Sequence, residues 1–204
     1  MIEPPLVRVA RDGEAAQVAQ VLTAAFGDEA GLNYWLRQGA AKEVARRAFF
    51  NAAVRDVVHP GRVLWLAQGD GAACGAAIWL GPGQQAYQFT FWRQLAVAPL
   101  LLRIAGVSGA MRGLTLGARL DALHPQALHA HLVFLGVAPS AQGSGVGSAM
   151  LKHQLAALDA RGTPALLEAT SERNVALYAR HGFETVENLE IADLHVRVMW
   201  RAPR

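Results

Sequence analysis

A glycine-rich segment in the second half of the chain is the clearest sign of chemistry. Residues 131–151 read HLVFLGVAPSAQGSGVGSAML, so an apolar run ends at a proline and Gly143, Gly145 and Gly147 precede a helical pattern. A glycine in a helix costs about 1 kcal/mol relative to alanine, so three at one helix start need a reason. Free amides in a first helical turn favour phosphate, and glycines let the backbone approach a ligand closely. The segment therefore predicts an anion cradle.

Two common phosphate-binding loops do not fit this segment. The triphosphate loop needs Gly-Lys-Ser/Thr, which does not follow these glycines. The dinucleotide pattern is matched by Gly143 and Gly145, with Glu168 about 20 residues further on. However, Ser148 occupies the third glycine position, and the segment between Val137 and Gly143 is too long for a tight strand-to-helix turn. Too little chain follows to complete a doubly wound sheet.

The spacing Gln142-x-x-Gly145-x-Gly147, preceded by LGVAP, resembles the acyl-CoA pyrophosphate loop of the GNAT superfamily of N-acetyltransferases. The run NVALYARHGF is similar to the family's later motif, Asn-x-x-x-Tyr-x-x-x-Gly-Phe. Taken together, QGSGVGS and LLEATSERNVALYARHGF are closest in motif to puromycin N-acetyltransferase-like small-molecule acetyltransferases. The resemblance covers about residues 131–183. It implies that acetyl-CoA is the co-substrate and that a primary amine of a small molecule attacks it directly in a ternary complex.

The resemblance also assigns the residues that would bind acetyl-CoA. Amides from Gly143 to Ser148 would hold the pyrophosphate, and the backbone of Leu135 and Val137 would pair with the pantetheine arm as an added strand. The amide of Val137 would polarise the thioester carbonyl. The predicted acyl-CoA-binding residues are Leu135, Val137, Gln142, Gly143, Ser144, Gly145, Val146, Gly147, Ser148 and Asn174.

Tyr178 is the predicted general acid, because the family uses a tyrosine at this position to protonate the departing CoA thiolate. A thiol of pKa about 8.5 is a tolerable leaving group, and a tyrosine of pKa about 10 can supply the proton. The structural alternative is a core aromatic residue on an amphipathic helix.

The proton acceptor has two candidates. An alkylamine of pKa about 10.4 is only about one part in 2,500 neutral at pH 7, so its proton must be removed. His131 lies eleven residues before Gln142 and titrates near neutrality, whereas Glu168 on the next strand could also bind a cationic substrate. His131 could instead be a solvated residue at a strand start, and Glu168 could pair with Arg173. His131, Glu168 and water remain open as the base.

The elements that must position these residues indicate an α/β (α+β) fold. The patterns predict a mixed, mostly antiparallel GNAT-type sheet flanked by helices, formed by one domain over residues 1–204. A helical insert over about 84–125, broken by Pro99 and several glycines, precedes the acyl-CoA-binding strand. The expected strands are 6–10, 164–170, a run ending at 137, a hairpin around the GDG turn of 69–71 and a final hairpin over 184–200; the expected helices are 14–26, 31–38, 40–58, 144–161 and 171–183.

Composition narrows the function classes. The chain has 204 residues, of which 52% are hydrophobic and 17% charged, and a net charge of +3 without a dense basic block, so no nucleic-acid partner is expected. Cys74 is the only cysteine, which excludes an internal disulfide and a cysteine-rich metal site. We expect no metal, no membrane span, a cytoplasmic location and a possible homodimer.

Two function classes compete with the enzyme. One is a catalytically silent acyl-CoA-binding or sensor protein on the same fold, against which Tyr178 argues. The other is a membrane-associated enzyme that uses the apolar segment 95–111, which Pro99 and Arg103 interrupt. We instead expect that segment, with Tyr34, Trp35 and Trp92, to wall the acceptor pocket.

Overall fold

A seven-stranded sheet organises the computed structural model, which describes residues 4–55, 61–69, 71–84, 86 and 91–204. The strand order is β1-β2-β3-β4-β5-β7-β6, and every neighbouring pair is antiparallel except β4 and β5. The predicted mixed, mostly antiparallel sheet is confirmed. The strands are β1 (Leu6–Val9), β2 (Val63–Gly69), β3 (Ala72–Leu80), β4 (Ala130–Val137), β5 (Ala165–Ala169), β6 (Glu184–Ile191) and β7 (Leu194–Arg201).

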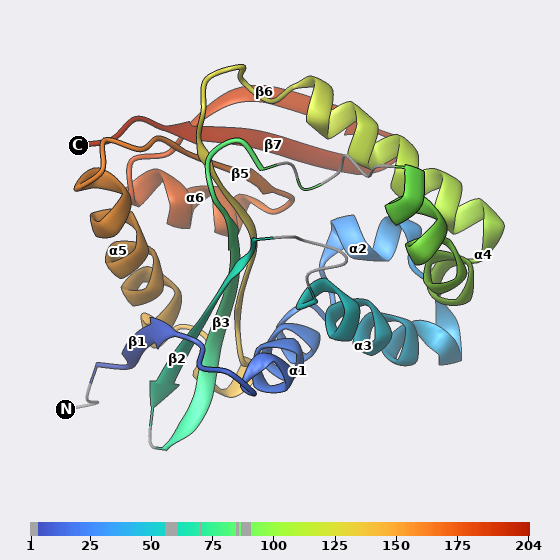
Figure 1. Ribbon diagram of the computed structural model, residues 1–204, viewed down its shortest axis with the longest axis horizontal. Coiled ribbons are helices and arrows are strands. Elements are labelled where there is room, and N and C mark those ends of the chain that lie inside the picture. Colours follow the sequence, from blue (N-terminus) through green and yellow to red (C-terminus); the bar gives the residue numbers. More distant parts are fainter. Residues whose placement is uncertain (1–3, 56–60, 70, 85, 87–90) are drawn as a thin grey trace.

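Helices cover both faces of this sheet (Figure 1). Four helices and a 3-10 turn come from the first part of the chain: α1 (Ala15–Ala25), α2 (Ala30–Trp35), η1 (Gly39–Ala41), α3 (Lys42–Ala53) and α4 (Phe91–Ala122). The others are η2 (Pro139–Ala141), α5 (Val146–Asp159) and α6 (Glu172–Arg180). Since successive side chains of a strand point to opposite faces, the side chains of β3 contribute to two hydrophobic cores, one on each face of the sheet. Ile78 packs with α1–α4, whereas Ala77 and Trp79 pack with α5 and α6.

The central helix α4 differs from its sequence-based prediction. The expected break at Pro99 is wrong, because Pro99 lies inside the helix; the backbone leaves helical geometry at Gly106, where φ is 69°. By length and composition, Leu95–Ala122 is apolar enough to cross a membrane, with a mean hydropathy of 1.4, which by itself is weak evidence for a span. The kink divides α4 into two pieces that are each shorter than the roughly 20 residues a straight span needs.

Some predicted features lie outside the described residues. They are Asp70 in the GDG turn, the last part of the helix expected over 40–58, and residues 85 and 87–90 at the start of the expected helical insert. The other expected helices and strands are present with bounds shifted by a few residues, as is usual where helix ends fray.

Candidate active site

The glycine-rich loop connects β4 to α5 and leaves the start of α5 open. Gly143 and Gly145 have φ of 83° and 88°, in the left-handed region that side chains other than glycine rarely adopt. Gly145 is the N-cap residue of α5, and no side chain caps the helix there. The amides of the first turn therefore point out of the helix end without a side-chain acceptor, and the helix dipole adds partial positive charge. This geometry is the one that the predicted anion cradle requires, and anion binding there stays a prediction.

Next to this loop, strands β4 and β5 separate. Their parallel pairing joins only Ala130–Leu132 to Ala165–Leu167 and ends there. The amide of Ala138 donates to Cys74 O across the β3 edge at 2.8 Å. Because antiparallel hydrogen bonding alternates along a strand, the amides of Val137 and Leu135 point the other way, into the gap between β4 and β5.

A groove of about 650 Å³ occupies this gap and continues to the glycine loop. Of the predicted acyl-CoA-binding residues, all but Ser144 line it. Ser144 is exposed, and its hydroxyl donates to Ala141 O at 2.7 Å. Gln142 already contacts the strand end, where its Nε2 donates to Val137 O at 3.2 Å. The structure thus brings the two sequence motifs to one groove.

Arg173 and Arg180 also line the groove, and sequence analysis missed them as ligand-binding candidates. Both belong to α6, where Leu177 lies between them and lines the groove as well. The spacing i, i+4, i+7 places the three residues on one helix face, and that signal was available in the sequence. Two guanidinium groups suit the phosphates of an acyl-CoA.

Tyr178 lines the same groove from α6 and is buried. Burial raises the pKa of its hydroxyl, and the negative charges of Glu29 and Glu168 raise it further. The hydroxyl therefore stays protonated over the physiological pH range. Its ring also packs edge to face on Phe183, with centroids 6.0 Å apart, so Tyr178 contributes to the core as well as to the groove.

The two candidate bases are in direct contact. His131 Nε2 donates to Glu168 Oε2 at 2.8 Å, and His124 Nε2 donates to Glu168 Oε1 at 2.6 Å. His131 is 1% exposed, so the solvated strand-start alternative is wrong, and Glu168 binds these histidines rather than Arg173. Sequence analysis missed His124, which follows α4 and is far from Glu168 in the chain.

Burial acts to raise the pKa of Glu168, but the charge of His131 and the hydrogen bonds from both histidines outweigh it and lower the pKa to about 2. The ligand atoms of His124, His131 and Glu168 lie within 4.8 Å of one another, and these residue types can hold a divalent metal. Ligands at zinc distances lie about 3.3 Å apart along a tetrahedral edge. The observed contacts of 2.6 and 2.8 Å are hydrogen-bond lengths instead. As built, the cluster is a hydrogen-bonded unit.

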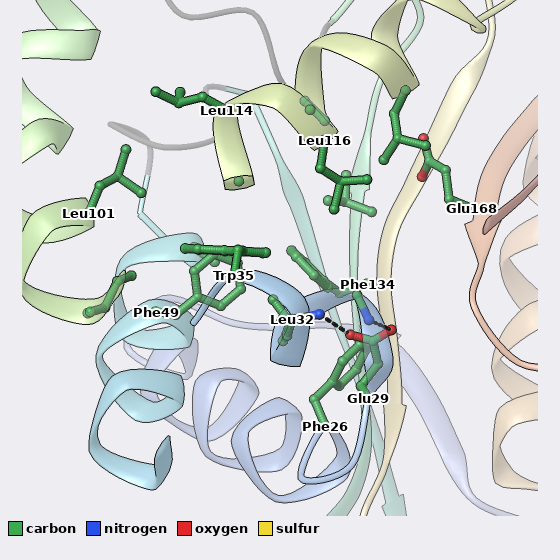
Figure 2. A pocket seen from close by; sticks show the side chains of 18 of the residues that line it. Phe26, Glu29, Leu32, Trp35, Phe49, Leu101, Leu114, Leu116, Phe134 and Glu168 are labelled. Carbon is green, nitrogen blue, oxygen red and sulfur yellow. Dashed lines mark hydrogen bonds between the residues drawn. The ribbon is translucent and has the colours of Figure 1, made fainter. Parts of the chain in front are cut away.

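A second cavity of about 230 Å³ lies between the sheet, α2, α3 and α4. Phe26, Glu29 and Thr170 line both cavities, so the two spaces meet at these residues. Glu29 caps α2 by accepting hydrogen bonds from the amides of Gly31 at 2.8 Å and Leu32 at 2.6 Å, and it also accepts from Thr170 Oγ1 at 2.5 Å (Figure 2). Sequence analysis did not find Glu29.

The predicted aromatic wall is only partly correct. Trp35 lines the second cavity and meets Phe49 edge to face, with ring centroids 5.4 Å apart. Tyr34 packs instead against the apolar cluster of α4 and β7, and Trp92 is 77% exposed. Leu101 of the apolar segment 95–111 also lines the cavity, and so does Leu116 beyond that segment; the use of this cavity by an acceptor stays a prediction.

Comparisons with known proteins agree with this geometry. Residues 105–185 match the family model described as acetyltransferase (GNAT) domain. The chain is 25% identical to a solved structure described as histone acetyltransferase HPA2 and related acetyltransferase from Corynebacterium glutamicum, with a TM-score of 0.78, covering 99% of this chain and 98% of that one.

Two insect enzymes share the fold at lower identity. A polyamine N-acetyltransferase of Drosophila melanogaster is 18% identical with a TM-score of 0.66, and the match covers 97% of this chain and 99% of that one. A mosquito arylalkylamine N-acetyltransferase-like protein is 18% identical with a TM-score of 0.64 and the same coverage. With the glycine loop and the splayed strands, the family match over residues 105–185 identifies a GNAT acetyltransferase domain, so the chain is an N-acetyltransferase.

Proposed function

We propose that the protein transfers the acetyl group of acetyl-CoA to a primary amine of a small molecule by direct attack in a ternary complex. The observation that carries the proposal is that the groove and the second cavity meet at Phe26, Glu29 and Thr170. An amine in the cavity would face a thioester held at the end of β4. Among the residues that line the two spaces there is no cysteine, which favours direct attack over an acetyl-cysteine intermediate.

In this proposal the predicted acyl-CoA residues keep their roles. The first-turn amides of α5 and the side chains of Arg173 and Arg180 would hold the pyrophosphate, and the outward amides of Leu135 and Val137 would pair with the pantetheine arm. The Val137 amide would donate to the thioester oxygen as negative charge develops there. The similarity to puromycin-type enzymes stays a prediction. We also infer that the described residues form one catalytic domain, since β1 and β7 belong to one sheet.

Glu168 is the group that would meet the substrate ammonium. It lines the second cavity, whereas His124 and His131 lie behind it and do not. The two histidines donate Nε2–H to it and lower its pKa to about 2, so the carboxylate is ionised and free to accept a proton on the cavity side. We therefore assign Glu168 as the proton acceptor, with His131 and His124 as the residues that position it.

Removing the amine proton is costly enough for this acceptor to matter. At pH 7 the neutral form of an alkylamine lies about 4.6 kcal/mol above its ammonium. Glu168 takes one proton from the ammonium, and the neutral amine attacks the thioester carbonyl to give a tetrahedral intermediate with a positively charged nitrogen and an oxyanion. Loss of the second nitrogen proton to water, followed by C–S cleavage with Tyr178 donating to the thiolate, gives the amide and CoA, and proton exchange with water restores both side chains.

Initial-rate kinetics with acetyl-CoA and a panel of primary amines test the proposal, with the acetylated amine identified by mass spectrometry. Lines that intersect in double-reciprocal plots are expected for a ternary complex. Parallel lines, or an acetylated protein isolated without amine, would contradict direct attack. Absence of transfer to every amine would contradict the proposed function as a whole.

The role of Glu168 is tested with Glu168→Gln and two amines of similar size, ethylamine and trifluoroethylamine; the fluorines make trifluoroethylamine largely neutral at pH 7. The variant should lose roughly 100-fold in kcat/KM with ethylamine and much less with trifluoroethylamine. Glu172→Gln, which neutralises an exposed carboxylate on α6, is the matched control and should behave as the wild type. Equal losses with both amines would mean that Glu168 positions the substrate without accepting a proton.

A further inference from the structure

Among the described residues, the carboxylates of the second cavity lie at one end. Of the residues that line it, Glu29, Glu168 and Thr170 carry polar oxygen atoms and Trp35 carries an indole N–H; all the others are apolar or glycine. Figure 2 shows the two carboxylates on one side of the cavity, and Trp35, Phe49, Leu101 and Leu114 away from them on the other side. The polar end is also the end that meets the acetyl-CoA groove, through Glu29 and Thr170.

We propose that the acceptor is a primary amine on an apolar body, with one positive charge and no second charged group. The inference rests on the proposed function and specifies its substrate class. The ammonium would bind between Glu29 and Glu168, where opposite charges favour the charged form until the proton leaves. The body would lie against the aromatic and aliphatic side chains, so that its burial contributes binding energy in proportion to apolar area.

Among the residues that the structure describes, none at the far end of the cavity offers a negative charge to a second ammonium. Charges placed in an apolar environment without a counter-ion are costly by several kcal/mol. Two arginines lie beside α2 and α4: Arg37 Nε donates to Arg103 O at 2.8 Å, and Arg112 Nε donates to Tyr34 O at 2.8 Å. Polyamines and other multiply charged amines should therefore be rejected.

The size of the cavity limits the body. An apolar cavity of about 150 Å³ holds one benzene molecule, or about 25 Å³ for each carbon atom. At the same density a cavity of about 230 Å³ holds about nine non-hydrogen atoms. Phenethylamine and medium-chain alkylamines fit this limit, whereas aminoglycoside-sized molecules exceed it.

Hexylamine and pentamethylenediamine form a matched pair, because the diamine only replaces the terminal methyl by an ammonium. We expect kcat/KM for hexylamine to exceed that for the diamine by roughly 100-fold or more at pH 7.5. Phenethylamine should be acetylated at least as well as hexylamine. Comparable values for hexylamine and the diamine, or transfer only to polar amines, would overturn the inference while leaving acetyl transfer itself established.

A charge placed at the apolar end provides an independent test. Leu114 lines the cavity and is 49% exposed, so Leu114→Glu adds a carboxylate there with access to water. This variant should reduce the preference for hexylamine over the diamine by at least about tenfold. Leu102→Glu is the matched control, since Leu102 lies on the same helix with 48% exposure but does not line the cavity. An identical preference in both variants and the wild type, with melting temperatures unchanged, would refute this placement of the substrate.

Discussion

Replacing Tyr178 by phenylalanine separates the chemistry of its hydroxyl from the packing of its ring. The ring contact with Phe183 is kept in the variant, since phenylalanine has the same ring. Within the part of the chain that the structure describes, no residue hydrogen-bonds the Tyr178 hydroxyl. Removing the hydroxyl therefore leaves no buried partner unsatisfied, and we expect the free energy of unfolding to change by less than about 1 kcal/mol.

The expected loss of rate follows from what the hydroxyl can do. Burial and the charges of Glu29 and Glu168 raise the pKa of Tyr178, so the proton-donor form is fully populated at every pH of the assay. The same shift makes Tyr178 a weaker acid than free tyrosine. A hydrogen bond to a charged group contributes about 1.5–3 kcal/mol, which corresponds to a factor of roughly 10 to 150 in kcat. Complete proton transfer in the transition state would raise the loss toward about 10⁴-fold.

Three measurements on the same preparations decide the role of Tyr178: the melting temperature, the dissociation constant of acetyl-CoA by calorimetry, and kcat from the release of the CoA thiol. The affinity of Tyr178→Phe should stay within a few-fold, because the hydroxyl acts mainly in the transition state. Tyr34→Phe is the control, since Tyr34 lines neither cavity. Full turnover in Tyr178→Phe would refute the reasoning, and so would parallel losses of stability and affinity with turnover per folded molecule preserved.

Gly145→Glu should abolish acetyl-CoA binding in calorimetry, because it adds a negative charge at the anion cradle. Gly13→Glu controls for backbone strain, since φ is 87° at Gly13 and 88° at Gly145 and a side chain at either position meets open space. Asp159→Asn should lower the free energy of unfolding by about 2 kcal/mol in urea titrations, because it leaves the buried Arg201 without its carboxylate; a change below about 0.5 kcal/mol would contradict this. Burial lowers the pKa of His129 below its unfolded value of about 6.5, so the unfolded state binds more protons than the folded state. The free energy of unfolding therefore falls as the pH drops below about 6.5, by at most about 1.4 kcal/mol per pH unit. His129→Gln should make the pH dependence shallower in this range, and an unchanged slope would be the contrary result.

The sequence by itself determined the elements and the co-substrate side of the site. Helices and strands follow from local periodicity, which neighbouring residues decide with little help from the rest of the chain. The glycine loop is also local: positive φ at Gly143 and Gly145 and an uncapped helix start arise within one short segment. The groove-lining motif residues could therefore be named before the fold was known.

The acceptor side was decided only by the tertiary structure. Thr170 bonds to Glu29 across 141 positions of sequence, and Glu168 joins His131 and His124 across 37 and 44 positions. No periodicity links residues so far apart, and His124 and Glu29 belong to no motif. Contacts of this kind arise when the order of strands in the sheet brings β4 beside β5 and packs α2 and α4 over their splayed ends. That arrangement turned two rival bases into one hydrogen-bonded unit and placed its carboxylate at the mouth of an apolar cavity.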